Sequence, residues 1–156
     1  MESKIEKLNS LLSDKKILLE DFYKLTIVQK KLIENNDIDK LNRIINNKEN
    51  VIEKINRLDV EFLGIYNNIK EVENINDLSQ LSIEKDYLVR LKELTSKCEK
   101  LMKTIKVQDD ENNNMMKSGF EDIKKSLREI KRGKTTTNKY YNNMPSSGGY
   151  FIDSKK

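Results

Sequence analysis

The sequence predicts an all-α protein: an elongated antiparallel three-helix bundle or coiled coil with a long third helix and a disordered C-terminal tail. Apolar residues make up 36% of the chain and charged residues another 36%, with no Trp. This is too little apolar material for a layered α/β core, but it is enough for narrow seams between helices. One Pro and five Gly leave few interruptions. The apolar residues also recur at steps of three and four, the period of amphipathic helices. At 156 residues, we expect one domain, a bundle over residues 1–132 followed by a flexible tail, 133–156.

The first helix is expected at about residues 2–34, where apolar residues occupy three neighbouring rows of a seven-residue repeat. These rows are Leu11, Leu18, Leu25 and Leu32; Ile5, Leu12, Leu19, Thr26 and Ile33; and Leu8 with Phe22. Three rows make a wide stripe, which packs against two other helices rather than one.

The second helix is expected at about residues 38–70, after a break at Asn35-Asn36-Asp37. Asp37 is a suitable N-cap, because its carboxylate can accept from free amides of the next turn. This helix again has three apolar rows: Ile38, Ile45 and Ile52; Leu41, Ile55, Phe62 and Ile69; and Ile44, Val51, Leu58 and Ile65. The short break predicts an antiparallel hairpin with the first helix.

Residues 71–83 are rich in side chains that favour turns and caps. We expect Leu78 and Leu81 on a short helical turn, and Ser82 as the cap of the third helix.

The third helix is expected at about residues 84–132, and it is the element around which the chain is organised. Its first seam carries Tyr87, Leu91, Leu94, Cys98, Leu101 and Ile105, and then a polar notch at Gln108–Asn114. A straight helix of this length spans roughly 73 Å, about 24 Å more than its partners. From about Met115 it must therefore project, fold back or pack loosely, and Gly119 is a candidate bend. The notch is the expected border between the bundle and a binding arm.

The notch admits two interpretations. Gln108 and Asn112 occupy seam positions, where buried amides can fix the register of helices; alternatively, the seam opens there and both are hydrated. Asp109, Asp110 and Glu111 are expected on a solvated face, because consecutive helical residues do not converge. Cys98 is expected to be a small buried hydrophobe.

The second half of the third helix is the candidate partner-binding site. Its apolar stripe, here called the arm stripe, comprises Met115, Met116, Phe120, Ile123, Leu127 and Ile130. Unbranched Met side chains repack easily and suit surfaces that meet more than one partner. Helix-in-groove or helix-on-helix recognition would use this surface.

The composition excludes most other functions. The chain has no His, no CxxC pair and no glycine-rich phosphate loop, so we expect no enzyme, catalytic residue, cofactor or metal site. The net charge is +5 from Lys131 onward and −1 before it, so the body has no basic face for nucleic acid. No signal peptide or membrane helix is apparent, which predicts a cytoplasmic protein without membrane insertion. The tail has no helical period, yet it carries Tyr140, Tyr141, Tyr150, Phe151 and Ile152; it is either a frayed end or a motif that orders on a partner.

The layout resembles the FlgN family of flagellar export chaperones over nearly the whole chain. The resemblance is carried by the Leu-rich first helix, by residues 34–41 (ENNDIDKL) leading into Lys48-Glu49, by the triplet 112–114 (NNN), and by residues 150–153 (YFID) before basic residues. It implies a helical bundle without enzymatic activity. It also implies binding of the C-terminal segments of the two hook-associated, hook–filament junction proteins through the C-terminal amphipathic helix, and delivery to the export apparatus.

Two other interpretations remain open on the residues. One is a chaperone of the filament cap protein, since such a chaperone is built on the same kind of helical bundle. The other is a structural coiled-coil protein that homodimerises through its third helix, since a long amphipathic overhang would serve that purpose equally well. We expect a monomer or a weak homodimer.

Overall fold

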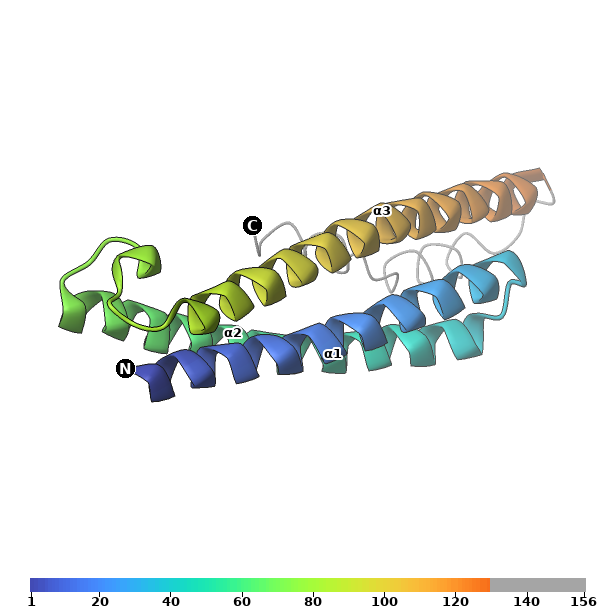
Figure 1. Cartoon of the computed structure of the whole chain (residues 1–156). Helices are drawn as coiled ribbons and strands as arrows, with labels where there is room; N and C mark the ends of the chain where they lie inside the picture. Colours follow the sequence, from blue (N-terminus) through green and yellow to red (C-terminus); the bar gives the residue numbers. More distant parts are fainter. Residues whose placement is uncertain (130–156) are drawn as a thin grey trace. The chain divides into compact units, whose positions relative to one another are not determined.

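The structure, a computed structural model, describes residues 1–129. This part contains three long α-helices, one short 3-10 helix and no strand. The elements, drawn in Figure 1, are α1 (Glu2–Glu34), α2 (Ile38–Glu73), η1 (Leu78–Gln80) and α3 (Lys85–Glu129). The predicted all-α class is confirmed. Residues 130–132 of the expected third helix and the expected tail, 133–156, lie outside the described residues.

The helix bounds agree closely with the sequence pattern, with small differences. α1 has the predicted bounds, whereas α2 continues past the expected end at Lys70 to Glu73. α3 begins at Lys85, so Glu84 directly precedes it and the predicted cap at Ser82 is wrong. Gly119 lies inside α3, and the helix is not interrupted there.

Two asparagines determine where α1 and α2 stop. Asn36 and Asn74 have φ angles of 55° and 51°, in the left-handed region that Asn tolerates better than most residues. The backbone N–H of Asp37 donates to the Leu32 carbonyl, and that of Ile75 donates to the Lys70 carbonyl, both at 3.0 Å. These are Schellman-type bonds, which satisfy carbonyls left over at a helix end.

The predicted cap at Asp37 is confirmed, since its Oδ1 accepts from the backbone N–H of Lys40 at 3.3 Å. Asp37→Ala removes this acceptor and is expected to lower the free energy of unfolding by about 1 kcal/mol. Urea unfolding followed by circular dichroism measures the change. Asn42→Ala, at an exposed site of the same helix, is the control and should stay within about 0.5 kcal/mol. Equal losses for both variants would contradict a capping role.

The connection from α2 to α3 is a compact capped turn. Asp77 accepts from the backbone N–H of Ser79 at 2.8 Å, and Gln80 accepts in return from the backbone N–H of Asp77 at 3.4 Å. This reciprocal capping box begins η1. Leu78 and Leu81 are buried, so the predicted short helical turn is confirmed.

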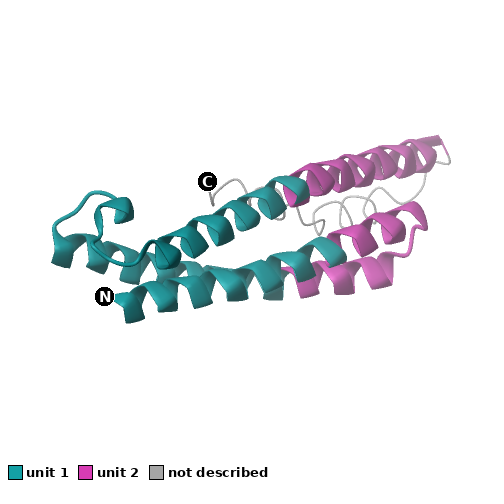
Figure 2. Cartoon of the chain, viewed as in Figure 1, with its two compact units in different colours: residues 1–24, 49–104 teal, residues 25–48, 105–156 magenta. Residues whose placement is uncertain are grey.

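The chain divides into two compact units, each containing parts of all three long helices (Figure 2). Unit 1 comprises residues 1–24 and 49–104, and unit 2 comprises residues 25–48 and 105–156, of which the last described residue is Glu129. The single domain expected over residues 1–132 stays a prediction.

Within unit 1, α1 and α2 run antiparallel, as expected for a hairpin. Lys4 Nζ donates to Asn68 Oδ1 at 2.8 Å, and Lys15 Nζ lies 2.8 Å from Asp59 Oδ1. A contact that lies later in α1 is made by a residue that lies earlier in α2, so the two helices are antiparallel. The core between them contains fully or nearly fully buried aliphatic side chains: Ile5, Leu8, Ile55 and Ile69.

In the same unit, α3 runs parallel to α1. Asn9 Nδ2 donates to the Tyr87 carbonyl at 3.3 Å, and Cys98 Sγ donates to the Leu12 carbonyl at 3.7 Å. Cys98 is buried, and burial raises the pKa of its thiol. It is therefore the small buried hydrophobe that the seam position predicts, because a reactive thiol needs exposure and a lowered pKa.

Candidate functional site

The arm stripe lies on the part of α3 that belongs to unit 2, and its members differ in exposure. Met116 and Phe120 are each 6% exposed, whereas Ile123 is 43% exposed. Met115 and Leu127 are half-buried. Ile130 lies outside the described residues. The sequence predicts one continuous face, but in the structure its first part is covered and Ile123 remains open to solvent.

Met116 belongs to an apolar cluster that joins α3 to both helices of the hairpin in unit 2. It packs with the buried Leu41 and Ile45 of α2, and the half-buried Leu32 and Ile33 of α1 pack against this group. Leu32, Ile33 and Leu41 flank the α1–α2 turn, so α3 still packs on the hairpin one helical turn past Asn112. The notch is therefore not the border at which the support of α3 ends. The helix continues to be held at Met116.

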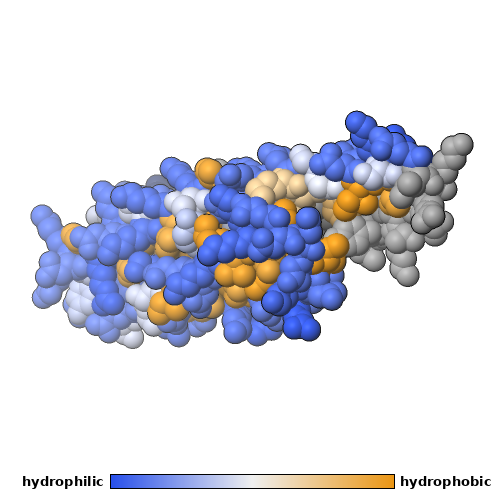
Figure 3. Space-filling model, turned by 90° about the vertical axis from the view of Figure 1, so that its right-hand side faces the viewer, coloured by the Kyte–Doolittle hydropathy of each residue, from blue (hydrophilic) through white to orange (hydrophobic). Residues whose placement is uncertain are grey.

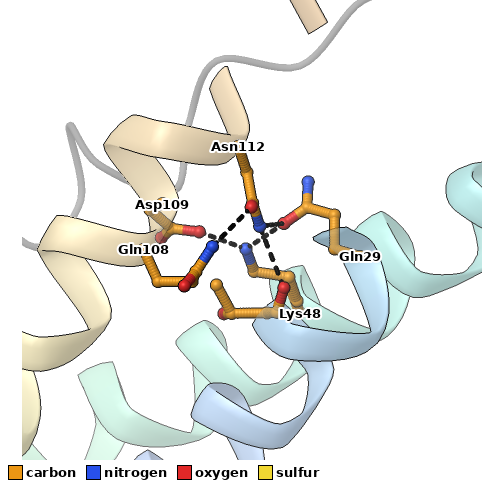
Figure 4. Close-up of polar contacts among 6 residues, drawn as sticks. Gln29, Lys48, Gln108, Asp109 and Asn112 are labelled. Atoms are coloured by element: carbon orange, nitrogen blue, oxygen red, sulfur yellow. Dashed lines mark hydrogen bonds and ion pairs between the residues drawn. The ribbon is translucent and has the colours of Figure 1, made fainter. Parts of the chain in front are cut away.

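The polar notch is a buried hydrogen-bonded site, which decides between the two interpretations for Asn112 (Figure 4). Asn112 is fully buried, and its Nδ2 donates to the Thr26 carbonyl at 2.9 Å and to Gln29 Oε1 at 3.2 Å. Gln108 Nε2 donates in turn to Asn112 Oδ1 at 2.9 Å. Because a buried amide is costly unless it is hydrogen-bonded, these contacts favour one register of α3 on α1.

A buried ion pair completes this polar cluster. Lys48 Nζ of α2 donates to Gln29 Oε1 at 2.7 Å and to Asp109 Oδ1 at 2.5 Å. The Lys48 and Asp109 side chains are only 6% and 3% exposed. We define the polar cluster as Gln29, Lys48, Gln108, Asp109 and Asn112, which come from all three helices.

The expectation that Asp109 lies on a solvated face is wrong. Asp110 and Glu111 are exposed, and they pair with Lys106 at 3.5 Å and with Lys30 at 4.0 Å. Asp109 instead points to Lys48, which is 61 residues away in the sequence. The three consecutive side chains do point in different directions, as expected, and that of Asp109 points into the core.

The signal that could have revealed this pair is a gap in the apolar rows. Lys48 occupies the seven-residue row that otherwise carries Leu41 and Ile55, and Asp109 lies midway between Met102 and Met116. Gln29 likewise continues the row of Leu8 and Phe22. A charge in an apolar row indicates a buried charge, but it does not identify the partner.

Burial governs the electrostatics of the pair. It raises the pKa of the Asp109 carboxyl, and the positive charge of Lys48 opposes the rise. It also lowers the pKa of the Lys48 ammonium, against the opposing effect of Asp109. Asp109 Oδ2 is buried without a hydrogen-bond partner among the described residues. Each side chain therefore keeps its charge largely because the other lies beside it. Such a pair favours one arrangement of the three helices more than it adds to the free energy of unfolding.

Neither a cluster of metal ligands nor a membrane-spanning helix is present among the described residues. In residues 1–129, no three His, Cys, Asp or Glu side chains gather as the ligands of a metal ion would. None of the described helices is apolar over a stretch long enough to cross a bilayer. What unit 2 presents is an amphipathic helix that is covered at Met116 and open at Ile123, an arrangement suited to binding another helix.

Comparison with known proteins identifies one family. The model of the family described as FlgN protein matches residues 1–144. No curated protein matches the chain, and no solved structure matches it.

Proposed function

Since this chain belongs to the FlgN family of flagellar export chaperones, we propose that it binds the C-terminal helical segments of the hook-associated proteins of the hook–filament junction. It keeps these subunits from assembling prematurely and delivers them to the export apparatus. The role in flagellar export follows from the family. The clients, the cytoplasmic location and the absence of enzymatic activity are part of the proposal.

The observation that carries the proposal is the exposed part of the arm stripe. Ile123 is 43% exposed on a helix whose other faces carry charged residues. Leu127 follows four residues later on the same face, as i and i+4 residues do. A free subunit with an apolar helical stripe needs such a surface to remain soluble, because contiguous exposed apolar surface promotes association.

The charge distribution supports a protein client over nucleic acid. The chain before Lys131 carries a net charge of −1, and binding to nucleic acid is driven largely by basic side chains that contact phosphates. Apolar recognition by a helix needs no such charge. The binding should therefore depend only weakly on ionic strength.

Leu127→Asp tests the role of the arm stripe. A charge at this position would have to be desolvated in the complex, so we expect the Kd for the C-terminal fragment of a hook-associated protein from the same cell to rise at least about tenfold. Isothermal titration calorimetry with the full chain measures the change. Ser126→Asp, at the exposed preceding residue, is the matched control and should bind as the unaltered chain does.

Binding by the unaltered chain, together with this variant, distinguishes the proposal from a filament-cap chaperone and from a structural coiled coil. If the unaltered chain binds only the filament cap protein, that client replaces the hook-associated proteins. If it binds neither and forms a dimer that Leu127→Asp dissociates, measured by light scattering, the protein is a structural coiled coil. A pull-down from flagellate cells that contains no flagellar subunit would contradict the proposed clients.

A further inference from the structure

The arm stripe cannot be used whole in the arrangement that unit 2 adopts. Met116 and Phe120 point away from solvent, and Ile123 on the same helix remains exposed. A client helix lying along the stripe would reach Ile123 and Leu127 but not Met116. If the whole stripe binds the client, α3 must separate from the hairpin at this point.

The surface that Met116 covers is itself suited to an amphipathic helix. It is formed by Leu32 and Ile33 of α1 and by Leu41 and Ile45 of α2. The more exposed Val28 and Ile38 belong to the same two helices of unit 2. Its present occupant is an amphipathic helix, α3, which shows what shape and polarity this surface accepts. The space-filling view shows apolar side chains in separate patches on a mostly hydrophilic face (Figure 3).

The packing of α3 in unit 2 changes at Asn112. Up to that residue, Ile105, Asp109 and Asn112 are buried, and the last two are held by the polar cluster. After it, Met116 and Phe120 are the only buried side chains among residues 113–129. Gly119 lies between them, and a Cβ built there would meet no atom within 4 Å. Gly is a poor helix former, and residues 113–129 bury fewer side chains than the part of α3 held by the polar cluster. We therefore take residues 113–129 as the segment that separates.

We propose that the client helix inserts between α3 and the hairpin of unit 2, so that Leu41 and Ile45 become part of the client-binding site together with Met116. This inference rests on the proposed function and adds to it a second binding face on α2. In the free protein, the two faces cover each other. The polar cluster keeps the register of α3 upstream while residues 113–129 move.

A distance measurement in the full chain tests the opening without altering the apolar cluster. Asn42 and Lys117 are exposed and adjoin Leu41 and Met116. Spin labels on Asn42→Cys and Lys117→Cys, in a Cys98→Ala background, report the separation of α2 and α3 by pulsed electron spin resonance. With saturating client fragment, we expect the distance to lengthen by about one helix diameter, roughly 10 Å.

A matched pair within the hairpin is the control. Labels on Lys31→Cys and Asn42→Cys, both exposed, should keep their distance when client is added. A client that binds while the Asn42–Lys117 distance stays the same would overturn the insertion and leave the proposed function intact. A chain that binds no hook-associated fragment overturns the proposed function, and the insertion with it.

A reversible crosslink provides a second, independent measurement. Leu41→Cys and Met116→Cys replace two side chains of one cluster, again with Cys98→Ala. The oxidised, crosslinked protein should bind the client fragment at least about a hundredfold more weakly than the same double variant after reduction. Equal binding by the reduced and oxidised forms would show that α3 need not leave the hairpin.

Discussion

Replacing Lys48 by Met is expected to lower the free energy of unfolding by about 3–5 kcal/mol, the usual cost of removing one partner of a buried ion pair. Lys48 Nζ donates to both Gln29 and Asp109. The variant leaves the Asp109 carboxylate buried, with Oδ2 already lacking a hydrogen-bond partner among the described residues. The loss would come mainly from this uncompensated charge, since Met fills much of the volume of Lys.

The double variant Lys48→Met/Asp109→Leu separates the charge from the packing. Replacing both partners by apolar residues of similar size is often neutral or stabilising, so most of the single-variant loss should be recovered. Urea unfolding of the four proteins of this cycle measures the coupling. Lys54→Met, at an exposed site of α2, is the control. A double variant as unstable as Lys48→Met would show that the cluster stabilises through its hydrogen bonds.

The pH dependence of the free energy of unfolding provides a second test with the same variants. Burial raises the pKa of folded Asp109 above the unfolded value of 3.8, and Lys48 opposes that rise. When a group has a higher pKa in the folded than in the unfolded protein, its protonation adds to the free energy of unfolding. This contribution is complete below the unfolded pKa and is lost as the pH rises through the folded pKa. The loss in Lys48→Met should therefore shrink as the pH falls from about 7 toward about 4. The double variant lacks Asp109 and should not share this change.

Phe22→Ala is expected to cost about 3–5 kcal/mol of unfolding free energy, the range for truncating a buried Phe. Phe22 is 2% exposed and is the largest fully buried side chain among residues 1–129. Its removal takes away apolar contact area and leaves a cavity that neighbouring side chains fill only in part. Thermal and urea unfolding of the full chain measure the loss.

Val60→Ala is the matched control for this truncation, because Val60 belongs to the same unit but is 73% exposed. It should change the free energy of unfolding by less than about 0.5 kcal/mol. Similar losses in the two variants would mean that side-chain burial does not govern the stability of unit 1.

The seven-residue rows and the asparagines account for how well the helices could be predicted. The bounds of α1 match because two of its apolar rows, from Ile5 to Ile33 and from Leu11 to Leu32, keep one period along the helix. Asn36 then adopts a left-handed φ of 55°. Asp37 could be assigned as a cap for the same local reason. The start of α3 could not be predicted in this way, and the cap assigned to Ser82 was wrong. Whether a helix begins one residue or three residues after Ser82 depends on small differences between competing local hydrogen bonds.

The candidate site follows less completely from the sequence. The sequence predicts the arm stripe as one face, but Met116 packs on Leu41 and Ile45, whereas Ile123 is exposed. Helix lengths placed the end of the support too early. A length comparison assumes that helices begin level with one another, whereas side-chain packing decides their offset.

The sequence by itself determined the helical class, the break between α1 and α2, and the buried faces of these two helices, because these depend on residues three to seven positions apart. Only the tertiary structure decided that Lys48 meets Asp109, that Asn112 meets Thr26, and that Met116 is covered. Those contacts depend on the register of three helices against one another. Register is an energetic balance over whole interfaces, and a periodic pattern repeats at every possible shift of seven residues.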